Sequence, residues 1–252
     1  FANILGFKNY FGKTEYNNDK DFDGIWAIWD EPFLQYFAKN VGKSNKPFMA
    51  TVFTASSHHP FKIPAQYEGK FKKGFVEMHE PIQYTDYALK KYFETARKQP
   101  WYENTIFVIT GDHTNKIYYP EYAKAMNGYA VPIIFYSPNP KYNLKGKNMT
   151  YAQQIDIYPT LADIIGYNKP LRSWGRSLVS DKNEEYIVVN SDAIQEQFMI
   201  GNYIYRFDGK DITGIYEITD LELKTNLLGK INNAEIERGK LLSKAWYQDY
   251  MH

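Results

Sequence analysis

The sequence predicts an α/β fold in which a mostly parallel sheet carries helices on both faces. Through the first two thirds of the 252 residues, short apolar runs of strand length alternate with stretches of helical periodicity. After about residue 185, several short strand-like runs follow one another and a helical stretch closes the chain, which adds an antiparallel meander. Hydrophobic residues make up 44% of the chain, so a substantial core is available.

The N-terminal third is expected to begin with a surface segment of about thirty residues, rich in polar and aromatic side chains. Asp30-Glu31-Pro32 then opens a helix, because acidic residues and proline suit a first helical turn, and Gly42 fits its end. Residues 47–54 (PFMATVFT) form a continuous apolar run that indicates a buried strand. Aromatic and alanine residues then recur on one face of a helix over 83–97.

Two further apolar runs indicate strands. Residues 105–110 (TIFVIT) are expected to be buried, and residues 131–136 (VPIIFY) carry a proline that suits the start of a strand. Residues 154–165 show helical spacing, and Gly166 fits the C-terminal stop.

The C-terminal part predicts antiparallel strands joined by turns such as Asp208-Gly209. The expected strands cover 186–189, 198–200, 203–207 and 214–218, and the closing helix covers 234–250. We therefore expect two parts: residues 1–184 as an α/β domain, and residues 185–252 as an antiparallel subdomain with a terminal helix packed on it.

Composition excludes several classes of function. A net charge of +1 without a lysine or arginine stripe argues against nucleic-acid binding, which depends on neutralising phosphates. The absence of cysteine excludes disulfides, zinc–thiolate sites and a cysteine nucleophile in this chain. No run of about 18 apolar residues indicates a membrane span. The first residue is Phe1, so the chain is expected to begin inside a longer protein, with a membrane anchor possible upstream.

Two predicted strands each end in a loop that contains histidine, SSHHPF and TGDHT. Because the carboxyl ends of parallel strands lie along one edge of a sheet, His58, Asp112 and His113 are expected to share a pocket. Imidazole and carboxylate suit a divalent ion, which can polarise a phosphoryl or sulfuryl oxygen. The alternative is an ordinary polar turn, since Gly-Asp commonly follows a strand.

The order of the motifs resembles the sulfatase branch of the alkaline phosphatase superfamily. Within it, the sequence is most similar to the extracellular catalytic domain of lipoteichoic acid synthases and related phosphoglycerol transferases. A tail at residues 215–228 resembles the closing segment of that family. The motifs that carry the resemblance are His58-His59-Pro60-Phe61, Tyr84-Thr85-Asp86, Gly111-Asp112-His113, the PIIFY of 132–136, Gln154-Ile155-Asp156 and Pro159-Thr160-Leu161.

The resemblance implies the roles of several residues. Asp112 and His113 are expected to bind one catalytic divalent metal ion, with manganese favoured and calcium, magnesium and zinc as alternatives. His58 is expected to contact the transferred phosphate or sulfate group, and His59 to be a bystander. Gln154 stands where two-metal relatives carry a histidine, which implies a single-metal site.

Three further positions leave alternatives open. Asp156 is expected to cap its helix, in keeping with the preference of aspartate for helix starts. Arg176, and with less support Arg172, is a candidate ligand for an anionic substrate group, although exposed loop arginines are usually solvated. Trp26 and Trp29 could stack on a sugar or headgroup, although packing at a sheet edge is the commoner role.

The family's nucleophile and first carboxylate ligand lie upstream of all these motifs, so no residue of this chain is expected to be the nucleophile. Residues 1–184 would then be the C-terminal part of a catalytic domain that is inactive alone. The function implied for the full-length protein is transfer of phosphoglycerol or a similar headgroup to an envelope polymer through a covalent intermediate. The alternatives are a sulfate-ester hydrolase and an inactive domain that binds glycans or partners.

The resemblance also implies partners and location. The substrate is expected to be a phospholipid headgroup or a sulfated or phosphorylated glycan. The protein is expected to work outside the cytoplasm, in the periplasm or at the cell surface, anchored through an upstream region.

Overall fold

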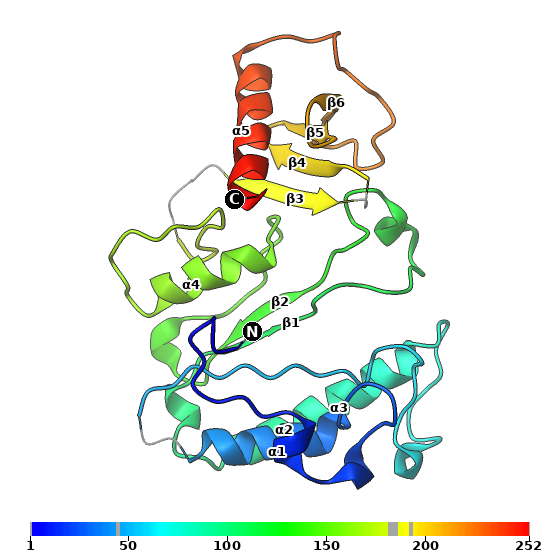
Figure 1. The fold of residues 1–252 in the computed structure, drawn as a ribbon, viewed down its shortest axis with the longest axis vertical. Coiled ribbons are helices and arrows are strands. Elements are labelled where there is room, and N and C mark those ends of the chain that lie inside the picture. Colours follow the sequence, from blue (N-terminus) through cyan, green and yellow to red (C-terminus); the bar gives the residue numbers. More distant parts are fainter. Residues whose placement is uncertain (1, 44–45, 181–185, 192–193, 252) are drawn as a thin grey trace. The chain divides into compact units, whose positions relative to one another are not determined.

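A computed structural model describes residues 2–43, 46–180, 186–191 and 194–251, which form two compact units (Figure 1). Unit 1 comprises Phe1–Thr105 with Ser137–Asn139, and unit 2 comprises Ile106–Tyr136 with Pro140–His252. The boundary expected between residues 184 and 185 lies outside the described residues. The two units are therefore described one at a time.

Unit 1 is built around two helices that lie side by side, α2 (Asp30–Val41) and α3 (His79–Ala96) (Figure 1). Their contact face buries Leu34 and Ala38 of α2 against large aromatic and small alanine side chains of α3. The alanines let the helix backbones approach closely, while the aromatic residues fill the remaining space. Both helices were predicted from the sequence, and α3 begins one turn earlier than expected. A short helix, α1 (Lys13–Tyr16), and 3₁₀ turns at Asp19–Asp21, Ala65–Tyr67 and Tyr102–Asn104 complete the unit.

The prediction of a buried strand over residues 47–54 is wrong. The segment has no strand structure, and the exposed fraction is 72% for Met49 and 69% for Phe53. No other segment among the described residues pairs with its backbone. A strand needs a hydrogen-bonding neighbour, which an apolar run does not itself provide.

Unit 2 contains a two-stranded sheet of β1 (Phe107–Thr110) and β2 (Ile133–Tyr136), with Phe107 opposite Tyr136. Both strands were predicted, but they pair antiparallel, and Phe107 is the only buried residue of β1. The connection between them holds only a 3₁₀ turn at Pro120–Ala123, whereas parallel strands need a long crossover, usually a helix. All strand pairs in the described residues are antiparallel, so the α/β class stands without its parallel character.

The rest of unit 2 follows the sequence closely. A 3₁₀ turn at Gln154–Asp156 leads into α4 (Ile157–Ile164), after which Gly166 adopts a φ of 77°. A further 3₁₀ turn lies at Pro140–Tyr142. The predicted meander is confirmed as an antiparallel sheet in the order β3-β4-β5-β6. Its strands are β3 (Ile187–Ser191), β4 (Glu196–Ile200), β5 (Tyr203–Phe207) and β6 (Ile212–Glu217).

The predicted closing helix, α5 (Ala234–Met251), packs along one face of this meander sheet (Figure 1). Ile236 is fully buried, and Trp246 meets Phe198 edge to face at 5.5 Å. At Gly239 an added Cβ would lie 2.1 Å from the Tyr205 ring, so only glycine lets the helix come this close. None of the described helices combines the length and apolarity needed to cross a bilayer.

Candidate metal and phosphate site

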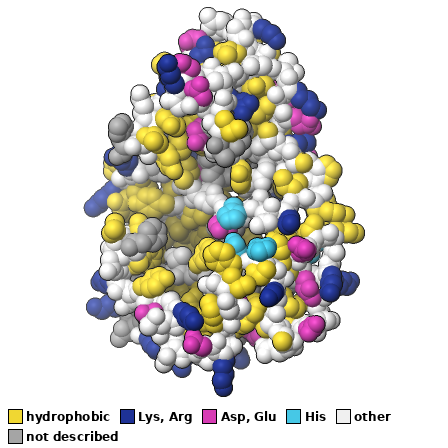
Figure 2. Space-filling view, turned by 45° about the vertical axis from the view of Figure 1, so that its right-hand side comes forward, with side chains coloured by type: hydrophobic (Ala, Val, Ile, Leu, Met, Phe, Trp, Pro, Cys, Tyr) yellow, Lys and Arg dark blue, Asp and Glu magenta, His cyan; other side chains and the backbone are white. Residues whose placement is uncertain are grey.

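The two histidine loops predicted from the sequence belong to different units. His58 lies in unit 1 and the Asp112-His113 pair in unit 2, so their placement in one pocket stays a prediction. Histidine side chains are open to solvent on the face shown in Figure 2. His58, Asp112 and His113 are all exposed, and each is therefore accessible to a ligand.

The imidazole of His58 is held by its own loop and by one tryptophan. Its Nδ1 lies 2.9 Å from the carbonyl oxygen of His59, and because a carbonyl only accepts, Nδ1 carries the hydrogen. The indole Nε1 of Trp26 donates to the same carbonyl at 2.8 Å, and the two rings meet edge to face at 4.5 Å. This arrangement fixes the tautomer and leaves Nε2 of His58 for a substrate.

The backbone just before His58 is anchored by Asp30, which is 1% exposed. Its Oδ1 accepts from the backbone N–H groups of Ala55 (3.1 Å) and Ser56 (3.0 Å). Its Oδ2 accepts from the Thr85 hydroxyl at 2.7 Å, and its own N–H donates to the Ser56 hydroxyl at 3.0 Å. Asp30 thus ties the first turn of α2, the His58 loop and α3 together. The sequence showed it only as a helix-start residue.

The Tyr84-Thr85-Asp86 motif supports this anchor from α3. Tyr84 is fully buried and its hydroxyl accepts from the backbone N–H of Glu31 at 3.2 Å. Burial raises the pKa of Tyr84, so its hydroxyl stays neutral. Thr85 bonds Asp30, whereas Asp86 is exposed. The first two motif residues therefore hold the loop that carries His58.

Asp112 and His113 follow β1, with a carboxylate oxygen of one close to an imidazole nitrogen of the other. The Asp112 Oδ2 lies 3.4 Å from the His113 Nε2, while Oδ1 accepts from the backbone N–H of His113 at 2.9 Å. The Nδ1 of His113 donates to the Thr114 carbonyl at 2.8 Å, which leaves the lone pair of the neutral imidazole on Nε2. The two side chains are 58% and 52% exposed.

These two residues fit part of a metal site. Two ligand atoms that each lie about 2.1 Å from one ion are roughly 3.0 Å apart at an octahedral angle and roughly 3.4 Å apart at a tetrahedral angle. The Oδ2–Nε2 separation of 3.4 Å falls within this range. Across the described part of the chain, no group of three or more His, Asp or Glu residues forms a complete site. The pair therefore offers two ligands, and a catalytic site needs about one more from protein.

Gln154 braces the loop that carries this pair. Its Nε2 donates to the carbonyls of Gly111 (3.3 Å) and Asp112 (3.1 Å). The Gln154 side chain therefore holds the backbone of the loop that carries Asp112 and His113. The sequence showed Gln154 only as a missing ligand, because the contact spans more than forty residues.

Asp156 has the capping role expected from its position. It is 3% exposed, its Oδ2 accepts from the backbone N–H of Gln153, and its Oδ1 accepts from that of Arg176, both at 2.9 Å. The Arg176 guanidinium donates to the Tyr151 carbonyl at 3.0 Å and lies 3.5 Å from the Tyr186 ring centre. Contact of Arg176 with substrate stays a prediction, since these partners already give it a structural role.

Arg172 and Trp174 of the same loop both bind Asp249 of α5. Arg172 reaches one carboxylate oxygen and the Trp174 indole the other, each at 2.6 Å. These hydrogen bonds lower the pKa of Asp249, with that from Trp174 the larger cause. Arg172 therefore fastens the loop to the closing helix.

Replacing Gln154 with alanine is expected to weaken metal binding by about 10- to 100-fold, the usual cost of losing a residue that orients metal ligands. The free carbonyls of Gly111 and Asp112 would let the loop rotate without removing a ligand. Metal titration of the complete protein by calorimetry measures the effect. Gln248→Ala, on the exposed side of α5, is the matched control, and equal affinities in the two variants would contradict the bracing role.

Asp30→Ala is expected to destabilise unit 1 by about 3 kcal/mol, because it leaves buried N–H groups without an acceptor. Asp30→Asn keeps the oxygen that serves Ala55 and Ser56 and can still bond Thr85, so its loss should be about 1 kcal/mol or less. Urea unfolding followed by tryptophan fluorescence measures both. Similar losses in the two variants would show that the hydrogen bonds are not what stabilises the loop.

Comparison with known proteins bears on the family and the fold of the chain. A family model described as Sulfatase matches residues 1–167. Lipoteichoic acid synthase 1 of Bacillus subtilis (strain 168) is 22% identical over 244 residues, which cover 88% of this chain and 38% of that protein. The chain thus spans little more than a third of that relative's length.

Two solved structures share the fold. A protein in the alkaline phosphatase superfamily from Vibrio parahaemolyticus superposes with a TM-score of 0.76 at 23% identity, covering 97% of this chain and 60% of that one. The lipoteichoic acid synthase LtaP from Listeria monocytogenes superposes with a TM-score of 0.71 at 17% identity, covering 99% and 65%. At these identities the likeness establishes the fold of the chain.

Proposed function

Because this chain belongs to the sulfatase family, we propose that it is the C-terminal part of a metal-dependent enzyme that transfers phosphoglycerol or a similar phosphate headgroup to an envelope polymer. The observation that carries the proposal is the pairing of Asp112 Oδ2 with His113 Nε2 at 3.4 Å, with the imidazole tautomer fixed by Thr114. Similarity to a lipoteichoic acid synthase supports the choice of a phosphate headgroup.

In this proposal, Asp112 and His113 hold one divalent ion, with manganese favoured. Such an ion supplies Lewis-acid polarisation of a phosphoryl oxygen. Other residues of this chain orient the two proposed ligands. The Thr114 carbonyl fixes the His113 imidazole, and Gln154 holds the backbone of the loop. The remaining ligands and the nucleophile are proposed to lie upstream of residue 1.

His58 is proposed to act on the transferred group. A hydroxyl upstream attacks phosphorus, the bond from phosphorus to the lipid oxygen breaks, and an acceptor hydroxyl later displaces the enzyme oxygen. In its protonated form, His58 carries a hydrogen on Nε2 as well as on Nδ1. This Nε2–H donates a hydrogen bond to the phosphoryl group or protonates the departing oxygen. The Asp30 and Trp26 contacts hold the imidazole loop in place for that role.

The location follows from the proposed substrates. An envelope polymer lies outside the cytoplasm, so we place the protein in the periplasm or at the cell surface, anchored through an upstream region. A sulfated or phosphorylated glycan is the alternative substrate.

The second candidate function is hydrolysis of sulfate esters, which the family description favours. The same Asp112, His113 and His58 would serve that reaction, since sulfate and phosphate groups have the same tetrahedral shape. The residue that attacks the ester separates the two functions: threonine supports transfer, and a modified cysteine or serine supports sulfate hydrolysis.

The test compares two substrates in the complete protein. With Mn²⁺, we expect release of diacylglycerol from phosphatidylglycerol vesicles and no release of nitrophenol from 4-nitrophenyl sulfate. EDTA should stop the lipid reaction and added Mn²⁺ should restore it. Cleavage of the sulfate ester without lipid turnover would overturn the transferase in favour of the hydrolase, and activity insensitive to EDTA would overturn both.

A further inference from the structure

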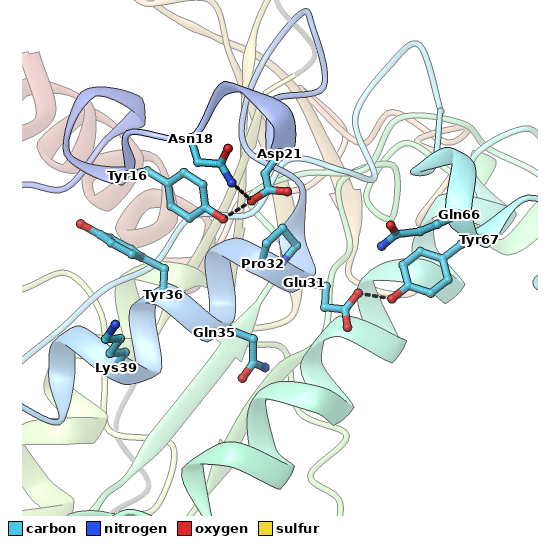
Figure 3. A pocket seen from close by; sticks show the side chains of 10 residues that line it. All are labelled: Tyr16, Asn18, Asp21, Glu31, Pro32, Gln35, Tyr36, Lys39, Gln66 and Tyr67. Atoms are coloured by element: carbon cyan, nitrogen blue, oxygen red, sulfur yellow. Dashed lines mark hydrogen bonds between the residues drawn. The ribbon is translucent and has the colours of Figure 1, made fainter.

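An open cleft lies in unit 1 along α2 (Figure 3). This open cleft has a volume of about 630 Å³, within the range of roughly 300–1,000 Å³ usual for small-molecule sites. Its walls come from the segment after α1, from one face of α2 and from the 3₁₀ turn at Ala65–Tyr67. None of the predicted site residues lines it.

Two wall tyrosines of the cleft are held by carboxylates and a third by the backbone (Figure 3). The hydroxyl of Tyr16 donates to Asp21 Oδ2 at 2.5 Å, and that of Tyr67 donates to Glu31 Oε2. The Tyr36 hydroxyl donates to the Glu15 carbonyl at 3.1 Å, and its ring meets that of Tyr16 edge to face at 5.1 Å. Burial, followed by these carboxylate bonds, raises the pKa of Tyr16 and Tyr67, so both remain neutral donors. The hydroxyl groups of all three tyrosines are therefore already hydrogen-bonded within the protein.

The cleft also keeps unused hydrogen-bonding groups. Within the described residues, the Lys39 ammonium and the Gln66 amide have no partner, and the Gln35 Nε2 is shielded from water without one. Asp21 and Glu31 each use one carboxylate oxygen for their tyrosine and leave the other unpaired. The cleft therefore offers a ligand both hydrogen-bond donors and hydrogen-bond acceptors, beside the rings of the wall tyrosines.

The charge of the cleft narrows the ligand class. Two carboxylates and one ammonium give a net charge of about −1, which disfavours phosphate or sulfate. A sugar carries hydroxyl groups that both donate and accept hydrogen bonds, so it can pair with the donors and the acceptors of the cleft. The apolar C–H face of its ring can pack against tyrosine rings.

We propose that this cleft binds a neutral glycan. Two neighbouring residues in the first turn of α2 connect the cleft to the His58 loop. Glu31 lines the cleft, and Asp30 accepts a hydrogen bond from the loop. A glycan bound at Glu31 would therefore lie next to the residue that anchors the proposed phosphate-binding histidine. Binding itself requires neither the metal nor the transfer reaction, so it can be tested independently of the proposed function.

The test uses a panel of neutral disaccharides, maltose, cellobiose, gentiobiose and lactose, with glycerol 3-phosphate and lactose 3′-sulfate as charged comparisons. Saturation-transfer NMR on the complete protein in EDTA identifies binders, and calorimetry gives Kd. We expect at least one neutral disaccharide to bind. Gln66→Ala and Lys39→Met should each weaken its binding by roughly 3- to 10-fold, the cost of one or two hydrogen bonds.

Lys90→Met is the matched control, since Lys90 is an exposed lysine on the neighbouring helix α3 and does not line the cleft. It should bind like the unmodified protein. The proposal is overturned if no neutral disaccharide binds, if Gln66→Ala and Lys39→Met leave the affinity unchanged, or if only the charged probes bind. All three variants change exposed side chains, and circular dichroism verifies that each remains folded.

Discussion

Alanine in place of Asp112 or His113 is expected to lower kcat/KM of the complete protein by about a thousandfold or more. Each substitution removes one of the two ligand atoms that lie 3.4 Å apart. A metal-polarised oxygen is worth several kcal/mol in the transition state, and each 1.36 kcal/mol is a factor of ten in rate. Turnover of phosphatidylglycerol measures the loss, and metal content after dialysis, determined by mass spectrometry, measures its cause.

The control for this pair is Asp19→Asn, which removes only an exposed ion pair with Lys13. It should retain both metal and turnover. If Asp112→Ala and His113→Ala keep the metal content and the turnover of the unmodified protein, the pair is an ordinary exposed ion pair and the metal assignment fails. Metal loss without loss of turnover would show that the reaction does not need the ion.

His58→Ala is expected to lower kcat by about 10²- to 10⁴-fold while the bound metal is retained. His58 touches the transferred group in the proposed mechanism but binds no ion, so the two readouts separate its role from that of Asp112. His59→Ala is a matched control next to it, because the His59 carbonyl, rather than its ring, holds His58 and Trp26. That variant should be nearly as active as the unmodified protein.

A conservative variant resolves what His58 does. His58→Gln supplies an amide donor near the Nε2 position but cannot transfer a proton at neutral pH. If charge stabilisation is the main role, His58→Gln should recover part of the rate lost in His58→Ala. If proton transfer to the leaving oxygen dominates, both variants should be equally slow. Full activity of His58→Ala would remove His58 from the mechanism.

The local elements of the chain could be predicted from the sequence because short-range signals specify them. Acidic residues and a proline begin α2, apolar spacing defines α3 and α5, and Asp208-Gly209 turns β5 into β6. The capping role of Asp156 and the histidine motifs could be predicted for the same reason. Each depends on residues within a few positions of one another.

The prediction for residues 47–54 failed for the opposite reason. An apolar run shows that a segment suits burial but does not supply the neighbour that would bury it, and Phe53 is exposed. The direction of β2 relative to β1 was equally hidden, because it depends on how residues 111–132 cross the unit.

By itself, the sequence determined where the long helices and the paired strands lie along the chain, and which residue types could bind a metal and a phosphate. The tertiary structure decided that Asp30 holds the loop of His58, that Gln154 braces the loop of Asp112, and that three tyrosines line a cleft. These contacts join residues far apart along the chain, and a buried carboxylate has no local pattern that names its partners. Folding alone brings them within hydrogen-bonding distance, so only the folded chain shows which polar residues support the site.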